Sequence, residues 1–273
     1  MVSIYSHLAE QRLARIFRAL GFLNPSPNLN LFPQSGVEIK MQSRIMIKKR
    51  MAGLVGCSIA VFCAMATVAC ASDTDAQFAK WFEVQTNLQS WSADFTQTRS
   101  LKVLSQPLVS AGRVWVAQGK FRWELGQPVQ TVVLRQPDQL LIIYPRLKRA
   151  EKYPLDGVPT GPIKDALALL DASLPRDRAT MEKNFLLLSA TETNSILQMT
   201  LQPRSDSARK FIGEIVIGFH TNNFTIAATE MRFSDGSSLR NDFTNVVLNQ
   251  QIDAAQFEAS LPPDFTVVEP LKQ

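Results

Sequence analysis

The 273-residue chain has few cysteines, and all of them lie near its N-terminal end. Cys57, Cys63 and Cys70 precede residue 72, so the 202 residues from there to the end contain none. This distribution excludes disulfide bonds, thiol catalysis and a cysteine-ligated metal site from the larger part of the chain.

Histidine is equally scarce, because the same 202 residues contain only His220. Acyl-transfer triads and zinc sites draw on histidine. His220 falls at the end of a predicted strand beside a turn, and we interpret it as a solvated residue. The sequence also lacks a Gly-rich phosphate loop and a Gly-x-Ser-x-Gly motif. We therefore expect no catalysis, no metal and no cofactor.

The chain after residue 71 has no excess of positive charge either. Eight basic and two acidic residues lie in the first 71 positions, which leaves 21 basic and 22 acidic residues for the rest. A nucleic-acid-binding protein needs a basic stripe to displace counterions from phosphates. The near-neutral remainder therefore argues against a nucleic-acid partner.

Residues 46–71 have the pattern of a secretory signal peptide. Met46 to Met51 include three basic residues, the run from Ala52 to Val68 is uncharged, and Ala69-Cys-Ala71 places small residues before Ser72. This order of basic, apolar and small residues predicts export and cleavage before Ser72. A retained membrane anchor is the alternative, since 17 apolar residues approach a membrane-spanning length. We expect residues 1–45 to lie upstream of the true start or to be unstructured.

Residues 72–273 are predicted to form one domain rich in antiparallel strands. Alternation and turn residues favour strands over 93–99, 111–117, 120–125, 130–135, 139–144 and 148–154, and further strands around 197–201, 211–219, 229–233 and 239–243. Two amphipathic helices are also expected. One begins at the capping box Thr74-x-x-Gln77, and the other runs from Pro162 to Leu170.

These elements predict an α+β fold, in which a large curled antiparallel sheet forms a half-closed barrel and the helices cover its concave face. The strands are rich in aromatic and apolar side chains such as Trp115, Phe121 and Trp123. If the helices fill the concave face, these residues form only a core. If the helices leave space, the residues line a cavity.

Several motifs resemble the outer-membrane lipoprotein carrier (LolA) family. They are Trp91-Ser-Ala-Asp-Phe-Thr-Gln97, Gly112-Arg-Val-Trp-Val116, Gly119-Lys-Phe-Arg-Trp-Glu124 and the C-terminal Leu261-Pro-Pro-Asp-Phe265. The resemblance implies a half-barrel with a helical lid, whose apolar cavity shelters lipoprotein acyl chains. By this resemblance Phe121 and Trp123 would face the cavity, with Phe95 and Trp115 nearby. Further residues expected to line it are Tyr144, Leu167, Leu170, Met199, Met231 and Phe233.

The family also implies a latch that holds the lid, and here this sequence departs from the pattern. Family members carry an arginine three residues after the strand tryptophan, in a Trp-Val-x-Arg-Pro run. This chain has Gln118 at that position and Gly119 in place of the proline. Arg113 and Arg122 are the alternative latch residues.

The resemblance thus implies a monomeric periplasmic carrier that is not an enzyme and that moves lipoproteins from the inner to the outer membrane. Its implied partners are acylated lipoproteins or other acyl lipids, an inner-membrane ABC-type release complex and, where one exists, an outer-membrane receptor. Two alternatives remain open. One is an accessory that carries another acylated lipid or a polyketide for an exporter, and the other is a non-transporting interaction or sensor domain.

Overall fold

The fold is described from a computed structural model, over residues 60–117, 119–155 and 177–270. The chain divides into two compact units, of which one is Pro25–Ala76. The other unit contains the sheet and the chain from Gln77 onward. Leu167 and Leu170, the predicted helix around them, and Gln118 lie outside the described residues.

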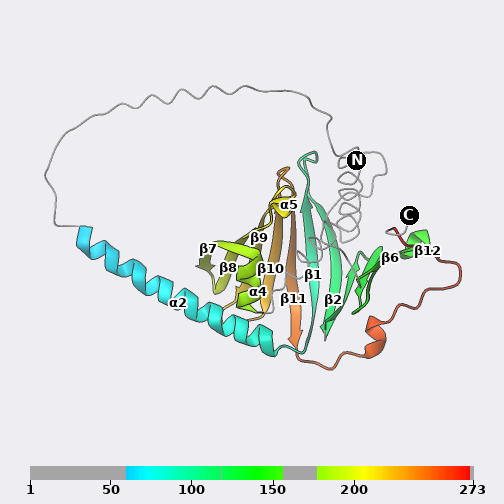
Figure 1. Ribbon diagram of the computed structural model, residues 1–273, viewed down its shortest axis with the longest axis horizontal. Helices are drawn as coiled ribbons and strands as arrows, with labels where there is room; N and C mark the ends of the chain where they lie inside the picture. The colour runs from blue at the N-terminus through cyan, green and yellow to red at the C-terminus, as the bar shows by residue number, and fades with distance from the viewer. Residues whose placement is uncertain (1–59, 118, 156–176, 271–273) are drawn as a thin grey trace, which may run out of the picture. The chain divides into compact units, whose positions relative to one another are not determined.

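Twelve strands form one sheet in the order β12-β6-β5-β4-β3-β2-β1-β11-β10-β9-β8-β7. In Figure 1 they run from β7 on the left, through β11 and β1 in the middle, to β6 and β12 on the right. The strands are β1 (Ser90–Ser100), β2 (Leu108–Ala117), β3 (Lys120–Leu125), β4 (Thr131–Arg135), β5 (Gln139–Tyr144), β6 (Arg149–Pro154), β7 (Phe185–Thr193), β8 (Ile196–Pro203), β9 (Ile212–His220), β10 (Ile226–Phe233), β11 (Ser238–Leu248) and β12 (Thr266–Val268).

The predicted fold class is confirmed, with one difference in the pairing. All neighbouring strands are antiparallel except β12, which pairs with β6 in parallel. The two ends of the order are β12 and β7, so the sheet is not closed into a barrel. A strand can pair in parallel only after a long connection. Here the chain between the end of β11 and the start of β12 leads to the edge of β6.

Within the described residues the α-helices are fewer than the strands, and the one long helix is α2 (Ala60–Asn87). The capping box at Thr74 predicts a helix start there, but α2 already begins at Ala60 and continues through that point. Residues 60–71 are mostly alanine and other apolar residues without proline or glycine, a composition that lets a helix extend. The expected helix is therefore present with a different N-terminus.

Two short helices and two strands were not predicted. The helices are α4 (Arg178–Asn184) and α5 (Asp206–Arg209), and the strands are β7 and the three-residue β12. In β7 the consecutive residues Leu186, Leu187 and Leu188 are all partly exposed. Period-two alternation is the signal for a half-buried strand, and this edge strand does not have it.

Strands β4 and β5 are buried on both faces. Val132, Val133 and Leu134 follow one another in β4, and all are at most 5% exposed. Val133 belongs to the core under α2, whereas Val132 and Leu134 pack with Phe257 from the C-terminal segment. Continuous apolar runs are typical of strands that are covered on both sides.

The C-terminal segment provides this second cover. The 3-10 turn η2 (Ala254–Phe257) buries Phe257, and Leu261 and Phe265 pack against the same cluster. The Gln136 side-chain amide donates to the Phe257 carbonyl oxygen at 2.9 Å. Residues 252–265 therefore cover the β4–β6 end of the sheet on the face away from α2.

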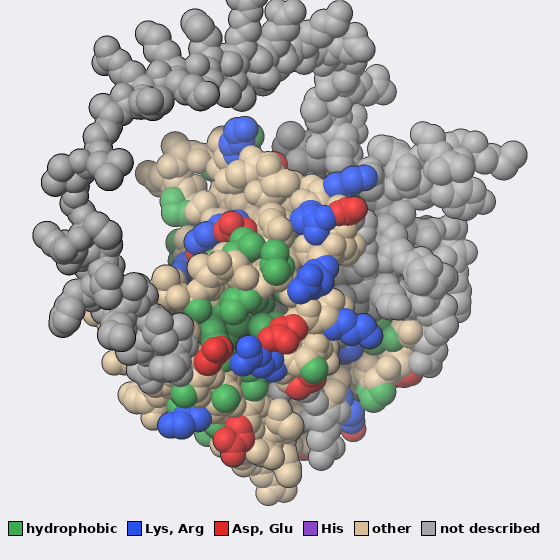
Figure 2. All heavy atoms as spheres, turned by 60° about the vertical axis from the view of Figure 1, so that its left-hand side comes forward, with side chains coloured by type: hydrophobic (Ala, Val, Ile, Leu, Met, Phe, Trp, Pro, Cys, Tyr) green, Lys and Arg blue, Asp and Glu red, His purple; other side chains and the backbone are tan. Residues whose placement is uncertain are grey.

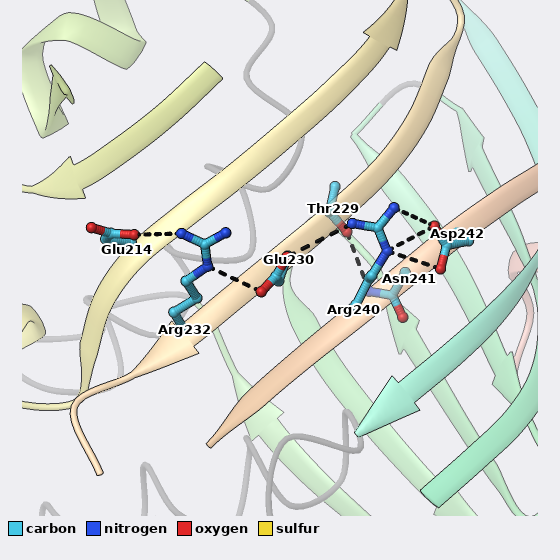
Figure 3. Close-up of polar contacts among 7 residues, drawn as sticks. All are labelled: Glu214, Thr229, Glu230, Arg232, Arg240, Asn241 and Asp242. Carbon is cyan, nitrogen blue, oxygen red and sulfur yellow. Dashed lines mark hydrogen bonds and ion pairs between the residues drawn. The ribbon is translucent and has the colours of Figure 1, made fainter. Parts of the chain in front are cut away.

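On strands β9 to β11 that same outer face carries a row of charges instead. Arg232 bridges Glu214 and Glu230 at 2.8 and 3.0 Å, and Arg240 contacts Asp242 at 2.6 Å (Figure 3). Arg232–Glu214 and Arg240–Glu230, the latter at 3.7 Å, are cross-strand pairs, and pairs of opposite charge suit a solvated sheet face. Here the sheet is polar outside and apolar inside.

The sheet must curl, because one apolar cluster draws on both of its ends. The cluster contains Leu140 and Ile142 of β5, Ile215 and Ile217 of β9, and Trp81 of α2. Strands β5 and β9 are seven steps apart in the strand order, which in a flat sheet would be roughly 34 Å. A curled sheet around α2 brings both ends to the same helix.

Candidate apolar binding site

The strand register determines which predicted site residues share a face. Trp123 is opposite Val114 in β2 and Val133 in β4, and Val133 is opposite Ile142 in β5. Directly opposite residues point to the same side of a sheet. Because Val133 and Ile142 pack in the cluster that contains Phe78, Trp81 and Phe82 of α2, Trp123 lies on the helix-covered face.

Phe95 and Trp123 form the aromatic centre of this face. Their ring centroids are 4.0 Å apart, and both rings approach Phe243 of β11 at 6.1 and 6.4 Å. Phe95 reaches Trp123 across Gly112, the β2 residue opposite Phe95. A Cβ atom at position 112 would lie 2.1 Å from Phe95 Cζ, so only glycine permits this contact.

Seven of the predicted residues lie on the helix-covered face, and they fall into two groups. Phe95, Met199 and Met231 are buried, with at most 3% exposure, and serve as core. The half-buried members are Phe121, Trp123, Tyr144 and Phe233. All four pack against the cluster that contains Trp81 of α2, which we call the main cluster. This second group retains surface that a ligand can contact.

Trp115 does not belong to this face. It is opposite Arg122 in β3, one residue out of step with Trp123, and packs with the cluster under the C-terminal segment. The Arg113 guanidinium lies 5.0 Å from the centroid of its ring. We therefore remove Trp115 from the candidate site, because successive residues of a strand point to opposite faces.

The two arginine candidates for a latch also lie on the outer face. Arg113 is 3.4 Å from Asp94, and Arg122 is 2.6 Å from Glu124 while donating to the Gln256 carbonyl oxygen at 3.3 Å. Neither can hold a helix on the opposite face. Arg122 instead fastens the C-terminal segment, a role that the sequence did not indicate.

A buried polar strip crosses the helix-covered face beside the aromatic centre. The Gln97 side-chain amide donates to Asn241 Oδ1 at 3.1 Å, and Asn241 Nδ2 donates to Thr229 Oγ1 at 3.3 Å. All three residues are at most 5% exposed. Paired amides of this kind fix the register of β1, β11 and β10, because an unpaired buried amide is costly.

The Trp123 indole places a buried donor in this region. Among the described residues its Nε1–H has no acceptor, and the same holds for the Nε1–H of Trp81 in the core. Buried polar groups are normally hydrogen-bonded.

The electrostatics of the two faces differ. On the inner face, burial lowers the pKa of the Arg99 guanidinium. On the outer face, the hydrogen bond to Glu230 raises the pKa of Arg232, and the hydrogen bond to Asp242 raises the pKa of Arg240. The outer face thus favours the charged forms of Arg232 and Arg240, whereas the inner face disfavours the charged form of Arg99.

In the described part of the chain, no group of three or more His, Cys, Asp or Glu side chains is placed to hold a metal ion. Of the helices within the described residues, none is long and apolar enough to cross a membrane.

Figure 2 shows a hydrophobic patch, bordered by basic and acidic side chains, on the surface seen when the left-hand side of Figure 1 is turned forward.

A large, mainly antiparallel open sheet with one apolar face under a helix agrees with the architecture that the motifs imply. The family model of the outer membrane lipoprotein carrier protein LolA matches residues 86–260. The chain belongs to this family. The match begins just before β1 and ends after η2, so it includes Phe95, Trp123 and the η2 part of the outer C-terminal cover.

Individual relatives of this LolA-family chain are distant. The outer-membrane lipoprotein carrier protein of Bordetella avium is 23% identical over 182 residues, which are 66% of this chain and 81% of that protein. The protein of the same name from Chromohalobacter salexigens is 27% identical over 184 residues, covering 67% and 81%. A LolA superfamily structure from Nitrosomonas europaea aligns over 68% of this chain and 97% of its own, with 10% identity and a TM-score of 0.36.

Proposed function

We propose that the protein is a periplasmic carrier that binds the acyl chains of lipoproteins on the helix-covered face and moves them from the inner to the outer membrane. In this proposal it acts as a monomer and a binding protein rather than an enzyme. The family assignment supports the carrier role. The proposed partners are acylated lipoproteins, an inner-membrane ABC-type release complex and a receptor at the outer membrane.

The half-buried aromatic side chains of the helix-covered face carry this proposal. Phe121 and Trp123 pack against the main cluster without being fully enclosed by it. When an acyl chain covers these rings, its transfer out of water is favourable by roughly 0.8 kcal/mol for each methylene group that is buried. The Trp123 indole N–H, which has no acceptor among the described residues, would donate to the ester or amide carbonyl that ends such a chain.

The proposal is tested by comparing Trp123→Ala with Trp115→Ala in the full chain. Both remove a half-buried tryptophan, from adjacent strands but opposite faces. The readout is the affinity for a fluorescent palmitoylated peptide, with the unacylated peptide as reference and circular dichroism as the check on folding. Trp123→Ala is expected to weaken binding of the acylated peptide at least tenfold, since about 1.4 kcal/mol corresponds to a factor of ten. Trp115→Ala is expected to retain it.

An equal loss of affinity in both variants would contradict the assignment of the site to the helix-covered face. Failure of the folded wild-type chain to bind any acylated probe would contradict the carrier function and favour an interaction domain. Native mass spectrometry of protein expressed from Met46 and purified from the periplasm then identifies the cargo. A mass that begins at Ser72 would establish cleavage, and a co-purifying acyl lipid other than a lipoprotein would favour the exporter-accessory alternative.

A further inference from the structure

The hairpin that joins β1 and β2 projects beyond the sheet on its β3 side. Its ladder continues to Arg99 opposite Leu108, whereas β3 ends at Leu125 opposite Gly112. Residues 108–111 of β2 therefore extend past β3 by about 13 Å. The tip, residues 101–107, extends further still and is ordered by a hydrogen bond from the Leu104 N–H to the Leu101 carbonyl oxygen at 2.9 Å.

This projecting hairpin exposes aliphatic side chains. Val103 is 80% exposed, Val109 62%, and Leu104 and Leu108 43% and 44%. Single exposed apolar residues scattered over a surface are ordinary, but a contiguous group marks a surface that contacts something apolar. Val103 and Leu104 lie at the tip, and Leu108 and Val109 follow it on opposite faces of β2. Because both faces of the projecting hairpin are exposed, these four side chains surround its end, and we call them the hairpin tip surface.

The charge within the hairpin itself is positive, because Lys102 is the one charged residue between Ser100 and Ala111. The neighbouring strand β11 begins at Ser238, opposite Ser100. The turn before it carries one carboxylate, Asp235, which accepts a hydrogen bond from the Ser237 N–H at 2.9 Å.

We propose that the hairpin tip surface inserts into the interface of an anionic lipid bilayer. Aliphatic side chains bind at the boundary between headgroups and acyl chains, and lysines beside them are attracted to anionic lipids. A protein partner fits the surface less well. Protein-binding hot spots are enriched in tryptophan, tyrosine and arginine, with leucine and valine under-represented, and residues 100–111 contain none of the enriched types. The inference concerns membrane contact and is independent of whether the inner face binds acyl chains.

The test is flotation of the full chain with vesicles of phosphatidylcholine alone and with vesicles containing phosphatidylglycerol. The wild-type chain is expected to bind the anionic vesicles more tightly. The variant V103S/L104S is expected to lose about tenfold in vesicle affinity. Lys102→Gln is expected to lose about fivefold on anionic vesicles and little on neutral ones.

A matched control is L186S/L188S, which replaces two leucines of β7 with exposures of 43% and 44%. This variant is expected to bind vesicles as the wild-type chain does. Equal losses in the two double variants would overturn the proposal, because binding would then follow general surface hydrophobicity. Unchanged binding by V103S/L104S, or no binding of the wild-type chain to either vesicle, would also overturn it. Unchanged far-ultraviolet circular dichroism in each variant shows that the comparison concerns the surface and not folding.

Discussion

Gly112 shows how one residue organises the aromatic centre. It lies between Phe95 and Leu125 in one cross-strand row of the sheet. The absence of a side chain lets the Phe95 ring lie across the backbone and contact Trp123 at 4.0 Å. The glycine is therefore required for steric reasons and not for its backbone conformation.

Gly112→Ala is expected to destabilise the protein by about 1–3 kcal/mol, the usual range for overpacking a core. The added Cβ would meet Phe95 Cζ at 2.1 Å and the Glu124 carbonyl oxygen at 2.5 Å. Urea denaturation followed by tryptophan fluorescence measures the loss. Gly213→Ala in β9 is the matched control, since the nearest atom to its Cβ is 3.6 Å away. Equal stability of the two variants would show that Phe95 can move aside freely.

At the scale of elements, the short helix α4 depends on its N-cap, the residue just before Arg178. The Asp177 carboxylate accepts the Thr180 N–H at 2.7 Å and caps the helix. This backbone hydrogen bond holds the pKa of Asp177 below its usual value. A carboxylate with a lowered pKa stabilises the folded state above its unfolded pKa and loses that contribution as the pH falls through the folded value.

The melting temperature of Asp177→Ala is therefore expected to lie below that of the wild-type chain at neutral pH, with the difference shrinking below about pH 4. Asp177→Asn is the control, because an asparagine oxygen also caps a helix but does not titrate. Its difference from the wild-type chain should be smaller at neutral pH. A difference for Asp177→Ala that stays constant down to about pH 2 would contradict a contribution from the charged cap.

For the whole molecule, α2 joins the two ends of the curled sheet. Trp81 is 1% exposed and stacks on Phe219 of β9 at a centroid distance of 4.9 Å. The same cluster contains Leu140 and Ile142 of β5. The helix therefore supports the curl as well as covering the apolar face.

Trp81→Ala is expected to destabilise the fold by about 3–5 kcal/mol, as for other large aromatic residues removed from a core. Lys80→Ala on the exposed side of α2 should change stability by less than about 0.5 kcal/mol. Guanidinium denaturation monitored by far-ultraviolet circular dichroism measures both. A small effect of Trp81→Ala would mean that the sheet keeps its curl without the helix.

Ten of the twelve strands, with approximate bounds, and the family were accessible from the chain itself, because alternation, turn residues and the Gly-Lys-Phe-Arg-Trp-Glu motif are local patterns. Strands β3 and β5 were predicted with the observed bounds. The scarcity of cysteine and histidine also argued against several kinds of chemistry. The expectations on the signal peptide, residues 1–45 and the latch at Gln118 stay predictions.

The assignment of side chains to faces required the tertiary structure. Alternation within one strand shows that Phe121 and Trp123 share a side, but not which side α2 covers. Trp115 was misplaced for this reason, since only its pairing with Arg122 sets it out of step with Trp123. The cover on the outer face of β4 and β5 likewise depends on Phe257, which is 121 positions from the Gln136 that binds its carbonyl oxygen. Local patterns reflect the backbone's preferences, whereas pairing between distant strands is a property of the folded chain.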